Sequence, residues 1–405
     1  MPVRKPKIKD VQMVFRNAFG FTPPFQVQSP TCLPLFGNLT ESSKGLAMGV
    51  ALEPMLSMAG APRTDGRIEL VCHGHDEKAS FWMTRLEPQA NAPWADPIIR
   101  TLAQLRKREI MFSGFNAAVL PPEDTASEEM IPIATALLIR ELRPFTITAS
   151  GLIRPPERDK RNQLPPLKDF EAHALASLCQ RARSDKPEHI SSLPFLTALN
   201  AQEYHAVCLD YHHETARPIV MAGSLALIIC PTATDQPFQT DWQTNFHTHA
   251  QSAAEKLRGR SLRSVDLEWL NEHKAKLTPD EFRVARYVVE EIIRTVYAEK
   301  ALNQSDPAQF AAYLTQSHEA GRELLNNTSP HTDLMFQLAR SHPACLGARV
   351  IGDGFDHPVI ALIEHFATKD FIQSISKLYQ DLTGKKVQPK ALPFTKAAGS
   401  SKNRW

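Results

Sequence analysis

The sequence predicts an α+β fold divided into two domains. A chain of 405 residues is too long for one hydrophobic core of ordinary size, and this favours two compact domains with a cleft between them. Alternating apolar and polar residues in the N-terminal half are typical of strands, whereas helical spacing dominates after Asp241. We therefore expect a strand-rich domain over 1–202, a helix-rich α+β domain over 203–388 and a flexible tail over 389–405.

The N-terminal half contains elements of both kinds. Residues 66–84 show a strand pattern that a turn at His73-Gly74-His75 interrupts. Residues 151–167 carry prolines and charges without periodicity, so we expect an inserted, exposed loop there. The other expected elements are a helix over 97–107 with Asp96 as its N-cap, a buried strand over 115–120, and helices over 133–142 and 170–183.

The C-terminal half is mainly helical, with a few apolar strands. Three helices are expected to begin where a capping residue precedes a proline, at Thr278-Pro279, Asp306-Pro307 and Ser329-Pro330. The remaining expected elements are strands over 204–209, 224–230 and 358–363 and a closing helix over 366–382.

The composition limits the function classes that suit the chain. A net charge of +2 and a hydrophobic fraction of 42% are ordinary for a globular protein, and predict no nucleic-acid or membrane partner. No stretch has the roughly 18 apolar residues of a membrane span, and the N-terminus lacks the apolar core of a signal peptide, so we expect a cytoplasmic protein. The cysteines show no CxxC spacing and predict reduced core thiols: Cys32, Cys72, Cys179, Cys208, Cys230 and Cys345.

Potential metal ligands do not form a recognisable site. Cys72-His73-Gly74-His75 matches no structural zinc spacing and is better explained by a β-turn. The pairs His212-His213 and His247/His249 suit surface positions. No G-x-S-x-G elbow is present. A Ser/His/Asp triad formed from residues distant in the sequence stays an open alternative. The sequence therefore predicts no metal site.

Two glycine-bearing segments near the chain ends are the most informative. Residues 29–40 read SPTCLPLFGNLT, and residues 347–356 read GARVIGDGFD. Eight words occur in order along the chain: VFRNAFGFTPPFQVQSP, GFNAAVLPPE, IATALLIREL, LASLCQRAR, LRSVDLEWL, VARYVVEEI, SHEAGREL and LGARVIGDGF. Together, over about residues 14–388 without the 151–167 insertion, the chain resembles the galactokinase family of the GHMP kinase superfamily. The resemblance implies a two-lobed GHMP kinase fold.

The resemblance implies that the sugar-binding segment has lost its reactive residues. In the family an Arg stabilises the transferring phosphoryl group, and Glu, His and Asp bind sugar hydroxyls. Cys32 stands at the Arg position, and the other three positions hold Asn38, Leu39 and Glu41. A neutral thiol cannot make the charge-assisted contacts of a guanidinium to phosphate. Asn38 and Glu41 still have the capacity to hydrogen-bond a small sugar or polyol. The fold-forming residues persist: Pro30, Leu35, Gly37, Thr40 and Gly45.

The family's phosphate loop and catalytic Asp are also replaced. The loop GLSSSAS corresponds to residues 124–130, which contain no glycine. Carboxylates there occupy the helix donors that a phosphate needs, and they repel a nucleotide. The family's Asp corresponds to Leu193, and residues 190–202 contain no carboxylate. The degenerate loop includes Asp124, Thr125, Ser127 and Glu128.

The C-terminal glycine turn is partly retained. The family has small residues throughout this turn, which lets the backbone approach nucleotide and sugar closely. Gly352 and Gly354 remain, whereas Asp353 and Asp356 replace small residues. Turn geometry alone explains the retained glycines.

Two functions follow from these replacements. The first is a galactokinase-like pseudoenzyme without phosphotransfer and without cofactor, which acts as a binding, regulatory or scaffold protein. The alternative is an active sugar 1-kinase that uses ATP and Mg²⁺, as the resemblance implies. Its substitute groups would be Asp124, Glu128 and Glu129 as metal ligands, Asp353 or Asp356 as base, and Asn38 and Glu41 at the sugar.

Overall fold

The computed structural model forms two compact units. It describes residues 10–122, 129–157, 164–183, 190–233, 240–257, 261–352 and 357–400, with residues 240–244 described by their backbone only. Unit 1 comprises Met1–Cys32, Glu53–Asn200 and Lys396–Trp405, and unit 2 comprises Leu33–Leu52 and Ala201–Thr395. Strands β1 (Phe25–Phe36) and β2 (Leu46–Pro62) each run from one unit into the other.

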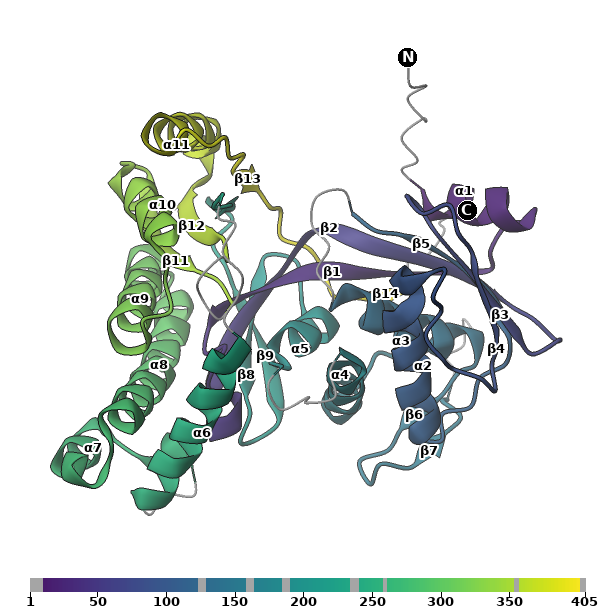
Figure 1. The fold of residues 1–405 in the computed structure, drawn as a ribbon, viewed down its shortest axis with the longest axis horizontal. Helices are drawn as coiled ribbons and strands as arrows, with labels where there is room; N and C mark the ends of the chain where they lie inside the picture. Colours follow the sequence, from purple (N-terminus) through teal and green to yellow (C-terminus); the bar gives the residue numbers. More distant parts are fainter. Residues whose placement is uncertain are drawn as a thin grey trace. The chain divides into compact units, whose positions relative to one another are not determined.

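Unit 1 is a sheet with helices on both faces. The strand order is β14-β1-β2-β5-β3-β4, and the β3–β5 pair is parallel. Helix α1 packs on β5 and β3, while α2, α3 and α4 pack together on the opposite face (Figure 1). Its other elements are α1 Val11–Phe19, β3 Arg67–Cys72, β4 Ala79–Trp82, η2 Pro93–Ala95, α2 Asp96–Lys107, β5 Phe115–Leu120, α3 Met130–Leu142, β6 Thr146–Ile147, β7 Ile153–Arg154, α4 Asp169–Arg183, α5 Leu193–Asn200 and β14 Gly399–Ser400.

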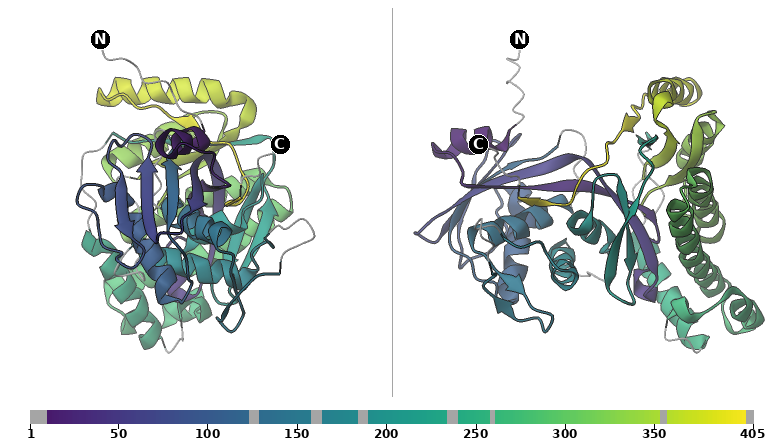
Figure 2. Two further views of the ribbon diagram at one scale, coloured as in Figure 1. Left: turned by 90° about the vertical axis from the view of Figure 1, so that its right-hand side faces the viewer. Right: turned by 180° about the vertical axis from the view of Figure 1, so that it is seen from behind.

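Unit 2 packs a helical layer on a small antiparallel sheet. The sheet order is β11-β12-β10-β13, and β8 pairs with β2 and β9. Helices α8 and α9 lie side by side, and α9 and α10 contact β11 (Figures 1 and 2). Its elements are η1 Glu41–Ser43, β8 His205–Asp210, β9 Thr215–Val220, β10 Leu225–Cys230, α6 Thr240–Lys256, η4 Leu262–Ser264, α7 Leu267–Glu272, η5 Lys274–Lys276, α8 Pro279–Asn303, α9 Pro307–Ala320, η6 Gly321–Leu325, α10 Pro330–Ser341, β11 Cys345–Val350, β12 Val359–Glu364, η7 His365–Ala367, α11 Thr368–Thr383 and β13 Lys390–Ala391.

Local capping rules placed the unit 2 helices correctly. Thr278 and Glu281 form a capping box at the start of α8. The side chain of Asp306 accepts a hydrogen bond from Gln309 N at the start of α9, and Ser329 caps α10 in the same way. All three predicted starts are confirmed, because each cap satisfies helix donors within one turn. In unit 1, Asp96 lies inside the first turn of α2 instead of at its N-cap.

Two predictions about irregular segments are wrong. The tail expected to be flexible contains β13 and β14, which pair with β10 and β1. Phe394 is buried in unit 2, and Thr395 N donates to Ala51 O at 3.0 Å. The expected loop over 151–167 includes β7, which pairs with β6; residues 158–163 lie outside the described part. In both segments the backbone groups pair with another strand, so residues without a periodic pattern still form strands. Residues 401–405 also lie outside the described part.

Candidate functional site

Gly37–Gly45 forms a tightly closed loop in unit 2, at the segment that resembles a sugar site. Gly37 has a φ of 70°, and a Cβ on it would lie 2.1 Å from Leu46 O. A Cβ on Gly45 would lie 2.6 Å from the Thr40 side chain. Within the loop, the Thr40 hydroxyl donates toward Gly37 O at 3.0 Å and Leu46 O at 2.8 Å. Both glycines are therefore required by close approach of neighbouring atoms.

A buried carboxylate anchors the beginning of this loop. Gly37 N donates to Glu291 Oε1 at 3.1 Å. Arg349 Nη1 donates to Leu35 O at 2.5 Å and lies 3.3 Å from Glu291 Oε1. Residues from β1, α8 and β11 thus meet around one side chain.

Glu291 is ionised despite complete burial. Burial raises the pKa of its carboxyl, but Arg294 and Arg349 outweigh this, so the pKa falls below its usual range. Arg294 Nη1 lies 2.9 Å from Oε2, and the Ser317 hydroxyl donates to the carboxylate at 2.8 Å. A buried charge of this kind is stable only with several partners. We call Gly37, Glu291, Arg294, Ser317 and Arg349 the Glu291 network.

A second ion pair anchors the end of the loop. Arg263, from η4, donates to Lys44 O at 3.0 Å. Its guanidinium also binds both carboxylate oxygens of Asp210 at 2.8 Å. Burial raises the pKa of Asp210, but its hydrogen bonds to Arg263 and His213 lower that pKa by more. The net pKa lies well below the usual range. The loop is therefore held at both ends.

The side chains of the loop have divided roles. Leu39 is buried in the apolar cluster of α6, α7 and α8, with Phe246 and Ala250. Asn38 and Glu41 are half-buried. Leu39 thus belongs to the core, whereas Asn38 and Glu41 retain polar groups at the loop surface. Their assignment to a sugar or polyol stays a prediction.

His318, which the sequence did not single out, lies beside the Glu291 network. Its Nδ1 accepts from Val350 N at 3.3 Å, and its ring stacks on Phe336 at 3.7 Å between centroids. Nε2 lies 3.8 Å from Asp333 Oδ1, too far for a hydrogen bond. Burial, with nearby Arg349 and Arg322, lowers the pKa of His318 to about 3. The ring is therefore neutral and structural.

The Glu291 network joins several of the words that carry the galactokinase resemblance. Glu291 lies in VARYVVEEI, Ser317 and His318 in SHEAGREL, and Arg349 in LGARVIGDGF. Arg263 lies in LRSVDLEWL. The sequence signal for Glu291 was its spacing, because it lies three residues after Val288 on the buried face of α8, where a charge must have a buried partner.

Unit 1 contains the position expected for the phosphate-stabilising Arg. Cys32 is buried, and burial together with the Glu129 charge raises the pKa of its thiol well above the usual value. Its Sγ makes a weak contact of 3.8 Å with Pro30 O. The neighbouring Thr31 hydroxyl donates to Pro54 O at 2.9 Å and lies 3.8 Å from Met130 Sδ. The thiol is thus neutral and enclosed.

The described start of α3 is acidic and apolar. Glu129 precedes the helix and forms an ion pair with Arg183 of α4. Met130, the first residue of α3, is 1% exposed. The Glu129 side chain makes no capping hydrogen bond to the first N–H groups of α3, and its carboxylate is paired with Arg183 instead. Asp124, Thr125, Ser127 and Glu128 lie outside the described residues.

The other predicted positions are divided between helix and turn. Leu193 begins α5 with a fully buried side chain, so this position belongs to the core of unit 1. Gly352 has a φ of 65°, in the left-handed region that favours glycine, and a Cβ there would lie 3.0 Å from His357. Asp353, Gly354 and Asp356 lie outside the described residues.

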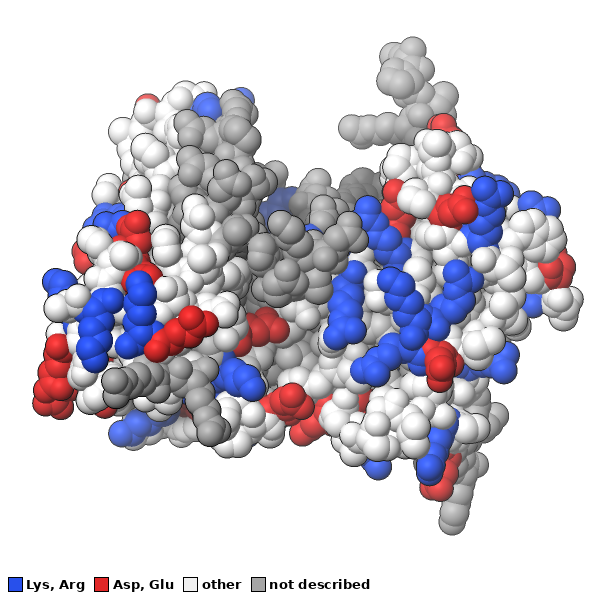
Figure 3. Space-filling view, turned by 60° about the horizontal axis from the view of Figure 1, so that its bottom comes forward, with Lys and Arg blue, Asp and Glu red and all other residues white. Residues whose placement is uncertain are grey.

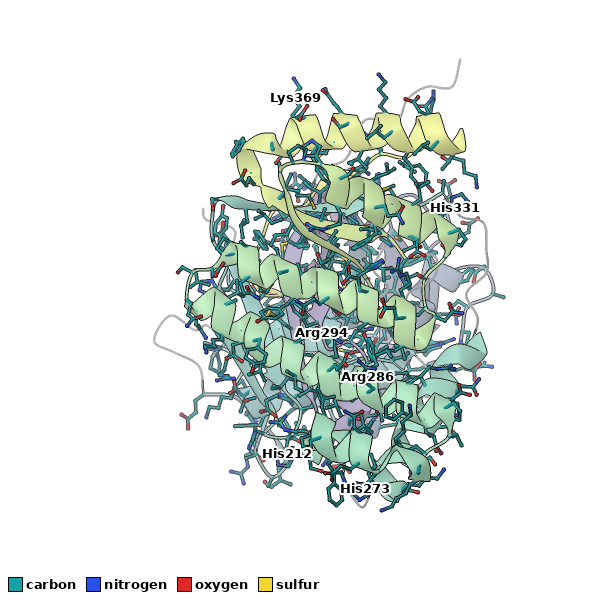
Figure 4. The ribbon with its side chains drawn as sticks, turned by 90° about the vertical axis from the view of Figure 1, so that its left-hand side faces the viewer. His212, His273, Arg286, Arg294, His331 and Lys369 are labelled. Atoms are coloured by element: carbon teal, nitrogen blue, oxygen red, sulfur yellow. The ribbon has the colours of Figure 1, made fainter. Side chains whose placement is uncertain are left out.

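A polar groove of about 280 Å³ lies on the helical layer of unit 2. Figure 4 shows two of its residues, Arg286 and Arg294, along α8. Both are paired with Glu290, at 2.8 and 3.2 Å. The arginines are thus neutralised internally. The groove is lined by Arg286, Glu290, Arg294, Gln316, Glu319, Ala320, Glu323 and Leu324.

The remaining metal-ligand types do not cluster. Cys72, Gly74 and His75 form the predicted turn, with His75 N donating to Cys72 O at 3.1 Å. His213 Nδ1 lies 3.0 Å from Asp210 and is exposed. Over the described ranges, no group of three or more His, Cys, Asp or Glu side chains is arranged to hold a metal ion.

Among the residues that the structure describes, no helix combines the length and apolar character that crossing a membrane requires.

Known proteins resemble the chain over nearly its full length. The galactokinase of Canis lupus familiaris is 27% identical over 386 residues, covering 92% of each chain. The galactokinase of Homo sapiens is 26% identical over 400 residues, covering 93% of this chain and 94% of its own. The solved structure of Lactococcus lactis galactokinase complexed with galactose has a TM-score of 0.82 and 17% identity, and covers 97% of this chain and 98% of its own.

No family model matches the chain. The full-length similarity and the structural match nevertheless agree with the order of words along the sequence. The chain is therefore similar to galactokinases over nearly its full length, and it has the α+β fold of the GHMP kinases.

Proposed function

We propose that this galactokinase homologue does not transfer phosphate and acts as a binding, regulatory or scaffold protein. The start of α3 carries the proposal, because Glu129 places a carboxylate where the family's phosphate loop meets its helix. The helix dipole and free N–H groups attract a phosphate, whereas the ion pair of Glu129 with Arg183 already occupies this end of α3.

Two further positions support the same function. The buried thiol of Cys32 stays neutral, so it offers no positive charge to a phosphoryl group. Leu193 supplies no carboxylate to activate a sugar hydroxyl. Loss of one charged contact to a transferring phosphoryl group costs orders of magnitude in rate. In this chain, the positions of both the Arg and the Asp hold uncharged residues, Cys32 and Leu193.

The retained loop Gly37–Gly45 suits a binding role. The Glu291 network and Arg263 hold its backbone in place, so any groups that it presents are preorganised. Asn38 and Glu41 are the polar side chains at positions where the family binds sugar hydroxyls. A small sugar or polyol is the ligand class that this loop would take.

A ligand titration tests the proposal. We expect no change in melting temperature or calorimetric signal when ATP with Mg²⁺ is added to the full chain. A nucleotide present at about 100 times its Kd would add about 2.7 kcal/mol of stability. Galactose and other hexoses are titrated separately, because sugar binding without nucleotide binding supports the binding role. Nucleotide-linked stabilisation at sub-millimolar concentration contradicts the proposal.

Arg183 favours the alternative, an active sugar 1-kinase. Its guanidinium pairs with Glu129, so a cation lies at the start of α3. In this alternative, ATP and Mg²⁺ would supply the phosphoryl group and its charge neutralisation. Asp124, Glu128 and Glu129 would be the metal ligands, and Asp353 or Asp356 the base.

A phosphotransfer assay separates the two functions. If the alternative holds, the chain phosphorylates a hexose, and Arg183→Ala abolishes this without loss of folding. Arg181→Ala, an exposed neighbour on the same helix, is the matched control. We expect no phosphorylated sugar from any of the three proteins.

A further inference from the structure

Unit 1 has an exposed basic face on the side of its α2, α3 and α4 helices. In Figure 3, lysine and arginine side chains gather on the right of the view with few acidic side chains among them. We define the basic face by six exposed residues: Arg100, Arg106, Lys107, Arg108, Arg143 and Arg154.

Local contacts place these residues on one continuous surface. Helix α2 packs beside α3 and α4, and Arg100 Nη1 approaches Arg183 O of α4 at 3.5 Å. The Arg108 guanidinium lies 4.0 Å from the Cβ position of Gly151, in the β6–β7 turn. Arg154 lies opposite Thr146 in the same hairpin. Thr146 is three residues after Arg143, so Arg143 lies next to this hairpin in the chain. The C-terminal ends of α2 and α3 therefore meet the hairpin.

The positive charge of this face is only partly offset by nearby carboxylates. None of the six residues forms an ion pair with a carboxylate of the part of the chain described. Arg106 donates to Met83 O at 3.0 Å, a neutral partner. Exposed Glu109 and Glu157 offset only part of the charge.

The helix dipole explains some of these positions but not all. Cations in the last turn of a helix gain about 0.3–1 kcal/mol, which accounts for Arg106 and Lys107. Arg100 lies in the first half of α2, and Arg154 lies on a strand. Neither gains from a helix C-terminus.

Exposed apolar side chains lie at the edge of the same face. Met111 is 58% exposed, three residues after Arg108. Leu152 is 55% exposed, next to the turn glycine that Arg108 approaches. Arginine and methionine are enriched in protein–protein interfaces, whereas interfaces with nucleic acid are more polar.

We propose that the basic face binds an acidic segment of a partner protein. Carboxylates of the segment pair with the arginines, and an apolar side chain packs against Met111 and Leu152. Charge complementarity carries the choice of partner, and the exposed apolar pair favours a protein over a nucleic acid. The inference gives a partner class to the proposed binding role, on which it rests.

Fluorescence anisotropy of the full chain tests the inference. The probe is a short labelled peptide of alternating glutamates with interspersed leucine and phenylalanine. We expect saturable binding that weakens with salt. Reversal of three charges, by Arg108→Glu, Arg143→Glu and Arg154→Glu together, should weaken binding by at least about tenfold, because like charges then face each other. The milder Arg→Gln triple variant covers the case in which charge reversal impairs folding.

A matched control separates this site from general charge effects. Lys276→Glu, Lys369→Glu and Lys377→Glu change the net charge equally on exposed positions of unit 2. Equal weakening by both triple variants overturns the inference. So does an absence of peptide binding, or tighter binding of a labelled DNA duplex than of the peptide. The ATP titration and the anisotropy measurement can fail separately. Nucleotide binding contradicts the proposed function, and a lack of peptide binding contradicts the inference.

Discussion

The loop Gly37–Gly45 and the start of α3 differ in what surrounds them. Around the loop, Glu291 and Arg263 form charged contacts with the backbone at both ends. At the start of α3, the corresponding surroundings are a neutral thiol, a buried thioether and the ion pair of Glu129 with Arg183. The comparison teaches that charged side chains from distant segments fix the backbone of the loop, whereas the start of α3 is surrounded mainly by enclosed, uncharged side chains.

The largest expected effect comes from removing the centre of the Glu291 network. Glu291→Ala leaves Arg294 and Arg349 buried without their carboxylate, which should cost about 3–5 kcal/mol of unfolding free energy. Urea denaturation measures the loss. Arg286→Ala is the control, since Arg286 is exposed and its i,i+4 pair with Glu290 is worth about 0.5 kcal/mol. Equal effects of the two variants would mean that the network does not support the loop.

A second variant tests how tightly the loop is closed. Gly37→Ala puts a Cβ 2.1 Å from Leu46 O at a positive φ, and should destabilise by about 2–4 kcal/mol. Gly20 also has a positive φ, of 83°, but has no atom within 4 Å of its Cβ position. Gly20→Ala should therefore cost only about 1 kcal/mol. Denaturation midpoints compare the two, and a similar cost would show that the loop yields easily.

The pH dependence of stability tests the neutral His318 beside the network. The pKa of His318 falls from 6.5 to about 3 on folding, so the unfolded chain binds the proton that the folded chain excludes. Stability from this group is full above pH 6.5 and declines as the pH falls toward 3, by up to about 1.4 kcal/mol per pH unit.

His318→Asn keeps an acceptor near Val350 N and removes the titration. We expect the unfolding free energy of this variant to change less between pH 6.5 and 5 than that of the unchanged chain. This range lies above the lowered pKa values of paired carboxyls, such as that of Glu281 at about 2. His342→Asn, at a histidine of α10–β11, is the control. An unchanged slope in the His318 variant would show that the ring titrates normally.

The smallest effect is expected at the α3 side of the comparison. Cys32→Ser should change stability by about 1 kcal/mol or less, since its weak contact to Pro30 O can be kept by a hydroxyl. It should also leave the response to ATP unchanged. A new nucleotide response in this variant would assign the thiol a part in excluding phosphate. Thermal shift with and without ATP and Mg²⁺ measures both effects.

Much of the fold was predictable because its signals are local. The caps at Thr278, Asp306 and Ser329 act within one turn, and the sequence placed those helix starts correctly. The turn after β3 followed from a glycine between polar residues. Strands β13 and β14 were missed because their residues carry little periodicity and depend on distant partners.

The candidate site was predictable only in part. The resemblance predicts replacements at Cys32 and Leu193, and both side chains are buried. Their correspondence to the family's Arg and Asp stays a prediction. The burial of Leu39 in the cluster of α6, α7 and α8 was not evident, because it depends on helices more than two hundred positions away in the chain. The roles of Asn38 and Glu41 stay predictions.

By itself, the sequence determined the fold class and the capped starts of α8, α9 and α10. These depend on residue identity and on neighbours within a few positions. Only the tertiary structure decided that Glu291 is a buried anion that holds Gly37, which lies 254 positions away. A carboxylate in the core is stable only where cations and donors from distant segments converge on it, and convergence is a property of the folded chain.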